Sequence, residues 1–240
     1  LPRTLGSEAA GEVLALGVGV TGFAPGDRVV FNGATGSYAD LTLAPASASV
    51  KLGDKVSFDT GVALHLQGIT AHALCKSVYP IQPGQWALVH AGAGGVGLLL
   101  IQMIKMHGAH VIATVSTEEK AALAREAGAD EVILYTQEDF VPAVARLTDG
   151  EKLPVVYDSV GKDTFLGSID CLRSRGYLVL YGQSSGRVEP VDPQLLNSKG
   201  SLFLTRPTMV NYTETRQELV ERTDDIYGWD NVVNTVEAKE

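Results

Sequence analysis

The pattern of apolar and polar positions changes near residue 57. Before this point the apolar residues come in short runs at residues 13–16, 27–31 and 38–43, and the second run follows the turn Ala24-Pro25-Gly26. Short apolar runs between glycine turns are typical of β-strands. We therefore predict a small β-rich domain or barrel in this part of the chain.

After residue 57 the pattern first becomes helical and then alternates between strands and helices. Ser57 or Asp59 is a candidate cap for a helix that runs through Leu66 to about Lys76. Strands are predicted at residues 86–90, 111–115, 131–135, 155–157, 177–181 and 201–205. Helices are predicted from the glycine-rich segment to about residue 107, and at residues 118–126, 140–147, 164–172 and 214–227. Strands joined by helical crossovers predict an α/β fold, a doubly wound parallel sheet.

Three glycines, Gly92, Gly94 and Gly97, form a G-x-G-x-x-G pattern between the predicted strand 86–90 and an apolar helical run. In dinucleotide-binding folds the first glycine permits a tight turn, and the second lets the backbone approach a pyrophosphate. The third lets the helix pack closely against the sheet. The N–H groups at the start of that helix then face the phosphates. The alternative is a purely structural glycine turn, which the flanking strand and helix disfavour.

The segment after the second predicted strand of the α/β part bears on the choice of nucleotide. NAD-binding proteins of this type place an Asp or Glu there, about 20 residues beyond the glycines, where it binds the ribose 2′-hydroxyl. Here the strand is followed by Ser116 and Thr117, with Lys120 close by and no carboxylate at the strand end. Hydroxyl donors and a cation suit a 2′-phosphate, so we predict NADP as the cofactor. The alternative for Lys120 is a solvated helix residue beside Glu118 and Glu119.

Composition narrows the class of protein. The 240 residues are 45% hydrophobic and 20% charged, with a net charge of −9, which disfavours nucleic acid as a partner. No apolar run reaches the length of about 18 residues that a membrane span needs. The two cysteines, Cys75 and Cys171, fit buried thiols in a reducing compartment, so a cytoplasmic protein is expected. Because the chain begins at Leu1 and enters a motif almost at once, we expect a longer polypeptide with a further N-terminal segment.

Several motifs point to one family. They are Gly6-Ser7-Glu8-Ala9-Ala10-Gly11, Gly26-Asp27-Arg28-Val29, Gln67-Gly68-Ile69-Thr70-Ala71, residues 90–97, Val156-Tyr157-Asp158-Ser159-Val160-Gly161, and Lys199-Gly200-Ser201-Leu202 with Thr205-Arg206-Pro207. Together they span most of residues 1–220, and the chain resembles the zinc-independent quinone oxidoreductases of the medium-chain dehydrogenase/reductase superfamily, the zeta-crystallin group. Gln67 departs from the pattern, because close relatives often carry Lys there.

The resemblance implies a truncated GroES-like β-rich catalytic domain at residues 1–66, a Rossmann NADP-binding domain at residues 67–206, and a partial return toward the catalytic domain at residues 207–240. It also implies a nicotinamide in the cleft between the domains, and a homodimer joined through the edge strand from Ser201 to Thr205. The family's NADPH contacts correspond here to Thr70, Gly95, Val96, Ser116, Lys120, Tyr135, Ser159, Val160, Tyr181, Gly182 and Ser184.

A zinc site is not expected. Zinc alcohol dehydrogenases of the superfamily carry Gly-His-Glu where this chain has Gly6-Ser7-Glu8, and a hydroxyl is a poor substitute for an imidazole ligand. A structural zinc lobe needs about four closely spaced cysteines. The five histidines, His90 among them, are interpreted as packing or surface residues. Glu8, Asp27 and Tyr38 are interpreted as structural, so no catalytic residue is assigned.

Sequence and resemblance together predict an enzyme that uses NADPH to reduce quinones or other α,β-unsaturated carbonyls without zinc. Such an acceptor needs no Lewis acid, because its own π system takes the hydride. Two alternatives stay open: an enoyl-thioester reductase, and an NADPH-binding, crystallin-like protein with little turnover.

Overall fold

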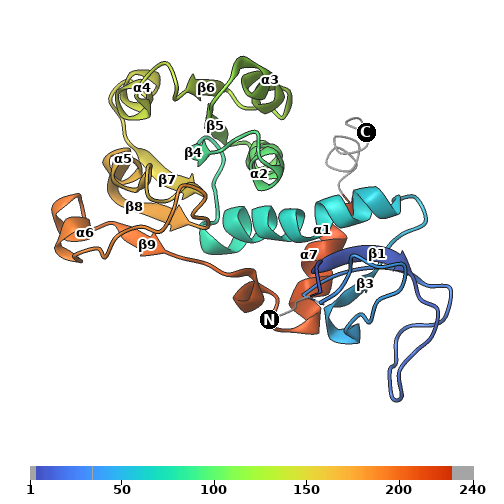
Figure 1. Cartoon of the computed structure of the whole chain (residues 1–240). Coiled ribbons are helices and arrows are strands. Elements are labelled where there is room, and N and C mark those ends of the chain that lie inside the picture. The colour runs from blue at the N-terminus through green and yellow to red at the C-terminus, as the bar shows by residue number, and fades with distance from the viewer. Residues whose placement is uncertain (1–3, 34, 229–240) are drawn as a thin grey trace. The chain divides into compact units, whose positions relative to one another are not determined.

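The computed structural model describes residues 4–33 and 35–228 and divides the chain into two compact units (Figure 1). The first unit consists of Leu1–Thr70 and Met209–Glu240, and the second is the continuous segment Ala71–Thr208. Residues 1–3 of the expected catalytic domain and residues 229–240 of the expected return segment lie outside the described residues.

The second unit is built on a single parallel sheet. Its six strands are β4 (Trp86–His90), β5 (His110–Val115), β6 (Glu131–Leu134), β7 (Leu153–Asp158), β8 (Leu172–Leu180) and β9 (Phe203–Thr205), in the order β6-β5-β4-β7-β8-β9. Every neighbouring pair is parallel. The chain runs from β4 to one edge, crosses to β7 and then runs to the other edge, which is the doubly wound arrangement. The predicted α/β fold is confirmed.

Helices cover both faces of this sheet. They are α2 (Gly95–Met106), α3 (Glu118–Glu126), α4 (Phe140–Leu147), α5 (Phe165–Asp170) and the short α6 (Gln194–Ser198). Helices α2 and α3 pack against β4, β5 and β6, whereas α4 and α5 pack against β6, β7 and β8; Figure 1 shows the two pairs on opposite faces. The sequence does not predict α6, a short helix preceded by Asp192, whose carboxylate accepts from Gln194 N at 2.9 Å.

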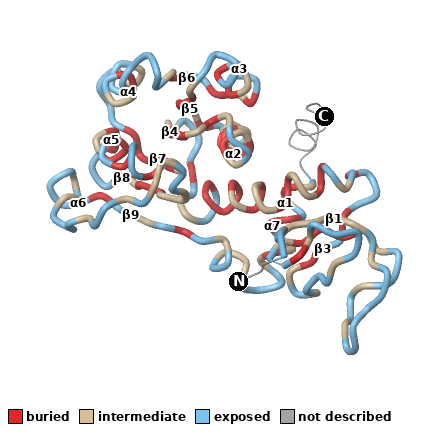
Figure 2. Tube along the Cα trace, in the orientation of Figure 1, coloured by how far each residue is buried: buried red, intermediate tan, exposed pale blue. Residues whose placement is uncertain are grey.

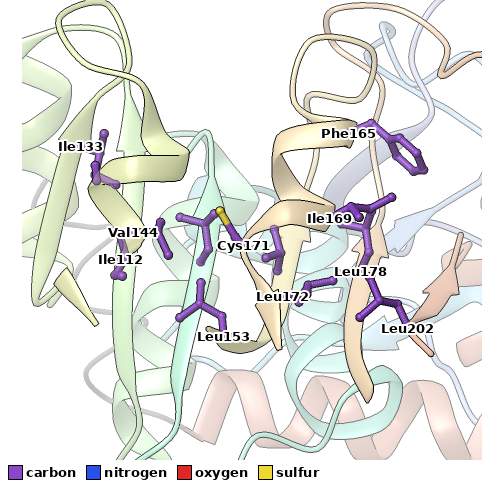
Figure 3. Close-up of a cluster of buried hydrophobic side chains, with 13 residues drawn as sticks. Ile112, Ile133, Val144, Leu153, Phe165, Ile169, Cys171, Leu172, Leu178 and Leu202 are labelled. Carbon is purple, nitrogen blue, oxygen red and sulfur yellow. The ribbon is translucent and has the colours of Figure 1, made fainter. Parts of the chain in front are cut away.

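Burial on both faces explains why these strands are apolar without alternation. All six residues of β7 are buried, and Figure 2 shows the buried positions concentrated in the sheet and the inner sides of its helices. On the α4–α5 face the apolar side chains form one cluster, which extends from Ile112 past Leu153 to Ile169 and Leu178 (Figure 3). Each fully buried aliphatic side chain contributes about 1.5–3 kcal/mol, so this cluster is a main source of the unit's stability.

Neither cysteine forms a disulfide. Cys171 lies in the same apolar cluster, and Cys75 is also buried. Burial raises the pKa of the Cys171 thiol to about 12, so this sulfur is a packing group rather than a nucleophile.

The first unit contains a small antiparallel sheet. Its strands β1 (Glu8–Glu12), β2 (Arg28–Asn32) and β3 (Ser49–Lys51) pair in sequence order, with Ala10 opposite Val30 and Val30 opposite Val50. A small antiparallel sheet in this part of the chain agrees with the β-rich domain expected there. Short 3₁₀ turns lie at η1 (Ala46–Ala48) and η3 (Met209–Tyr212).

Two strands predicted for this sheet are wrong. Residues 13–16 and 38–43 form no strand in the described structure, and Leu14 and Leu41 are exposed. Strand β1, which the sequence does not predict, consists largely of Ala and Gly, and these residues favour strands weakly. Pairing with β2 therefore decides which segment becomes a strand, and the apolar runs remain loops.

Helices α1 (Phe58–Ala73) and α7 (Arg216–Gly228) agree with the sequence pattern. The Ser57 hydroxyl accepts from Thr60 N at 3.0 Å, so Ser57 rather than Asp59 is the cap of α1. The helix continues into the π turn η2 (Leu74–Val78). Tyr227 of α7 donates to Gly61 O of α1 at 2.7 Å, which joins the two chain segments of the first unit. No helix among the described residues is long and apolar enough to cross a membrane.

Candidate functional site

A cavity of about 650 Å³ lies in the second unit, at the carboxyl ends of its strands. It is lined by His90, Ala91, Ala93, Gly94, Thr114, Val115, Ser116, Lys120, Tyr135, Glu138, Asp139, Phe140, Val160, Asp163, Thr164, Ser184 and Ser185. These residues come from the ends of, or the loops after, β4, β5, β6, β7 and β8, except that Lys120 and Phe140 lie in the first turns of α3 and α4. The strand order reverses at β4 and β7, and ligands of open α/β sheets bind beside that reversal.

The loop between β4 and α2 has no room for side chains at two of the three predicted glycines. A Cβ on Gly92 would lie 2.7 Å from Ala113 Cβ, and one on Gly97 would lie 2.4 Å from Ala91 O. The residue with a left-handed backbone is Ala91, with φ of 51°, and not a glycine. Gly92 is therefore needed for close packing on β5 rather than for the turn conformation predicted for it.

The start of α2 faces solvent without a side-chain cap. The N-cap residue is Gly94, which has no side chain to cap the helix. Gly94 and Gly95 are both exposed. The N–H groups of the first turn, including Gly95 and Val96, have no acceptor within the helix. They form the positive end of the helix dipole, which is suited to an anion.

The end of β5 carries the hydroxyl and cation that the sequence predicts. Lys120 Nζ donates to Ser116 Oγ at 3.1 Å, and both residues line the cavity together with Tyr135. Thr117 does not line it. Its hydroxyl accepts from Lys120 N at 3.3 Å and caps α3.

The loops after β7 and β8 approach each other closely. A Cβ on Gly182 would lie 2.4 Å from Ser159 O, and Ser184 N donates to that same carbonyl at 3.1 Å. Val160 and Ser184 line the cavity, whereas Ser159, Tyr181 and Gly182 do not. The Tyr181 hydroxyl is buried, and this burial raises the pKa of Tyr181 to about 12.

Thr70 is the predicted contact that lies outside the second unit. It belongs to the first unit, on α1, and its hydroxyl donates to Leu66 O at 2.7 Å.

Sequence reasoning missed a group of cavity residues that follow the strand ends and bear polar or aromatic side chains. They are Thr114, Glu138, Asp139, Phe140, Asp163, Thr164 and Ser185. Their shared signal is position, because each lies at or after the carboxyl end of a strand that was itself predicted. It also missed Asp158, which is fully buried and accepts from Val160 N at 2.8 Å and from Gly161 N at 3.0 Å.

The histidines and cysteines do not form a metal-binding cluster among the described residues. Among the described residues no group of three or more His, Cys, Asp or Glu side chains could hold a metal ion. His107 Nδ1 bonds Met103 O at 2.7 Å, and His110 stacks on Trp86 with ring centroids 4.8 Å apart. Glu8, next to Ser7, has a raised pKa because it is partly buried.

Comparison with known proteins gives two family matches. Residues 1–63 match the alcohol dehydrogenase GroES-like domain, and residues 95–225 match the zinc-binding dehydrogenase family. Together these two matches cover the small sheet and most of the parallel sheet.

Individual relatives are more specific. A quinone oxidoreductase of Pseudomonas aeruginosa is 46% identical over 229 residues, which are 95% of this chain and 70% of that protein. A 2-haloacrylate reductase of a Burkholderia species is 41% identical, over 92% of this chain and 67% of that protein.

A solved structure agrees with these relatives. The Escherichia coli quinone oxidoreductase complexed with NADPH matches with a TM-score of 0.93 and 44% identity, over 95% of this chain and 70% of that one. The chain therefore belongs to the zinc-independent quinone oxidoreductase family of the medium-chain dehydrogenase/reductase superfamily.

Proposed function

We propose that this protein is an NADPH-dependent oxidoreductase that reduces quinones or other α,β-unsaturated carbonyls without zinc. The observation that carries the proposal is the cavity at the strand reversal, with an uncapped helix start on one side and the Ser116–Lys120 pair on another. Family membership supports the reaction class, and the 2-haloacrylate reductase relative supports conjugated acceptors beyond quinones.

The chain's own residues fit the proposed cofactor. The first turn of α2, at Gly95 and Val96, would hold the pyrophosphate beside Gly92, Gly94 and Gly97, whose lack of side chains keeps the loop compact. Ser116, Lys120 and Tyr135 would hold the 2′-phosphate, with Thr117 keeping Lys120 at the start of α3. The remaining proposed contacts are Thr70, Ser159, Val160, Tyr181, Gly182 and Ser184.

When bound, NADPH supplies a hydride to the acceptor. The protein's contribution is to orient the dinucleotide and exclude water, and to stabilise the negative charge that develops on the acceptor oxygen.

The domain assignment is part of the same proposal. We assign residues 1–66 and 207–240 to the catalytic domain and residues 67–206 to the NADP-binding domain. The contiguous parallel sheet and the separate antiparallel sheet support this division.

A homodimer in the cytoplasm completes the proposal. Strand β9 lies at the edge of the sheet, where Phe203 is 48% exposed although it stacks on Tyr177 with centroids 4.4 Å apart. An exposed apolar edge strand is suited to pairing with a second copy. Light scattering on a size-exclusion column should give twice the chain mass, and Leu204→Lys should give a monomer.

An acceptor panel tests the reaction. NADPH oxidation by the purified protein is followed with a quinone, a simple enone and an enoyl thioester, each also with NADH. The proposal expects faster oxidation of NADPH with quinone or enone, and little with NADH. A preference for the thioester would instead make the protein an enoyl-thioester reductase. Tight NADPH binding without turnover of any acceptor would leave a binding protein.

A further inference from the structure

Four polar side chains form a continuous buried series at the wall of the cavity. His90 Nδ1 lies 2.9 Å from Thr114 Oγ1, and His90 Nε2 lies 3.0 Å from Ser168 Oγ. Ser168 Oγ in turn donates to Asp158 Oδ2 at 2.9 Å. All four are at most 2% exposed, and His90 and Thr114 line the cavity while Ser168 and Asp158 lie behind them.

The hydrogen bonds of the series can run in only one direction, because the donor and the acceptor of each bond can be assigned. The Asp158 carboxylate accepts from Val160 N, Gly161 N, Thr164 Oγ1 and Ser168 Oγ. A serine hydroxyl has one proton, and Ser168 donates it to Asp158. Ser168 Oγ must therefore accept from His90 Nε2–H. Burial lowers the pKa of His90 to about 4, and the imidazole is neutral at ordinary pH. Its Nδ1 then has no proton and accepts from the Thr114 hydroxyl.

The series connects the elements that form the cavity. His90 ends β4 and directly precedes the glycine loop, Thr114 lies near the end of β5, and Asp158 ends β7. Ser168 fixes α5 to them, and the Phe140 ring of α4 meets the His90 ring edge-on with centroids 4.8 Å apart. The strand ends that carry the proposed dinucleotide contacts are thus joined by hydrogen bonds away from water.

We propose that Thr114, His90, Ser168 and Asp158 are positioning residues, a one-directional hydrogen-bond series that holds the ends of β4, β5 and β7 in the geometry that binds the dinucleotide. The binding part of this inference rests on the function proposed above. The series moves no proton in the reaction, and its role is to keep the glycine loop and the β5 end at a fixed separation.

The direction of the series is tested without any ligand. Nitrogen-15 NMR of the labelled protein identifies the His90 ring signals by their loss in His90→Gln. We expect a protonated Nε2 and an unprotonated Nδ1, unchanged between about pH 5.5 and 8.5. A Nδ1–H tautomer, or an imidazolium in that range, would overturn the proposed direction.

The positioning role is tested by NADPH binding, followed by the fluorescence of NADPH. Thr114→Val and Ser168→Ala should each raise the Kd for NADPH about tenfold, since each leaves a buried group unpaired at the cavity wall. Thr114→Ser, which keeps the hydroxyl, should bind as the wild type does.

Thr223→Val is the matched control. Thr223 is as buried as Thr114, and its hydroxyl donates to Leu219 O at 2.7 Å in the first unit. It should lower Tm and leave the Kd unchanged. If Thr114→Val also lowers Tm with an unchanged Kd, the series is merely structural and the positioning role is wrong. If the wild type itself binds no NADPH, the proposed function fails, while the NMR result still decides the direction of the series.

Discussion

Lys120 is the one lysine or arginine among the described residues that line the cavity. Two of the three carboxylates there have other partners: Glu138 pairs with Arg146 at 2.8 Å, and Asp139 caps α4 by accepting from Val141 N. Lys120 Nζ is held by Ser116 Oγ at the end of β5. A preference for NADPH over NADH, which differ in the ribose 2′-phosphate, would therefore depend mainly on the Lys120 ammonium group.

Lys120→Ala should lower kcat/KM for NADPH about 10–100-fold, because a hydrogen bond to a charged group contributes about 1.5–3 kcal/mol. The value for NADH should change little, so the preference between the two nucleotides shrinks. Steady-state kinetics with both nucleotides measures this change.

Lys152→Ala, at an exposed position that does not line the cavity, is the control and should leave both values unchanged. An equal fall in kcat/KM with NADPH and NADH in Lys120→Ala would show that Lys120 does not bind the 2′-phosphate.

Individual residues show where sequence reasoning stops. Ser116 and Lys120 could be predicted as neighbours of the 2′-phosphate because they follow a predicted strand within a few residues in the sequence. Thr117 was predicted beside them, but its hydroxyl caps α3, since a threonine at a helix start serves the nearest unpaired N–H group. His90 was interpreted as a packing residue, and no local pattern places it 3.0 Å from Ser168, 78 positions away.

Among the elements, the loop from β4 into α2 depends most sharply on its sequence. Gly97 lies so close to the loop that an added Cβ would meet backbone oxygens of Ala91 and Gly92 at 2.4 and 2.8 Å. Backbone atoms cannot turn away as a flexible side chain can. The start of α2 would have to shift, and with it the N–H groups proposed to face the pyrophosphate.

Gly97→Ala should destabilise the protein by about 1–3 kcal/mol, the usual range for overpacking, and should abolish measurable NADPH binding. Urea unfolding and NADPH titration measure the two effects. Gly53→Ala is the control, because Gly53 has no atom within 4 Å of an added Cβ. Normal NADPH affinity in Gly97→Ala would argue against the proposed role of the α2 start.

The elements also differ in how visible they are in the sequence. The strands of the parallel sheet are buried on both faces and stand out as apolar runs between helices. Strand β8 is longer than predicted, since it begins at Leu172 and includes the exposed Arg173 and Arg175. Strand β1 is missed altogether, because pairing with β2 and not side-chain character makes it a strand.

At the scale of the whole molecule, the buried side chains of His65 and His90 bear on stability. Burial lowers the pKa of His65 and of His90 to about 4, against an ordinary value of 6.5. The unfolded chain binds these protons below pH 6.5, whereas the folded protein binds them only near pH 4. Their stabilising contribution is therefore complete above pH 6.5 and is lost as pH falls toward 4.

The free energy of unfolding should fall between pH 6.5 and 4, with a slope of up to about 1.4 kcal/mol per pH unit for each histidine. Urea denaturation at a series of pH values measures this slope. His65→Leu should reduce it, since the His65 ring has no hydrogen-bond partner among the described residues and leucine leaves nothing to titrate. A slope unchanged in His65→Leu would mean that this histidine is not buried in neutral form.

Metal removal is the second test that concerns the entire protein. Ser7 stands where zinc-dependent members carry histidine, and the described residues offer no cluster of metal ligands. Dialysis against a zinc chelator should leave kcat and KM for NADPH and quinone within about twofold of the untreated values. Elemental analysis should find less than stoichiometric zinc. Activity lost to the chelator and restored by zinc would contradict the proposed zinc-free reaction.

The sequence by itself determined what depends on neighbouring residues: the parallel-sheet strands, most helices, the glycine loop, and the hydroxyl and cation after β5. These follow from periodicity, capping and the space requirements of short segments. Only the tertiary structure decided which segments pair as β1, β2 and β3, that Ala91 and not a glycine takes the left-handed turn, and that Thr114, His90, Ser168 and Asp158 meet. The physical reason is that these contacts join residues far apart in the chain, whose meeting depends on the packing of the whole unit.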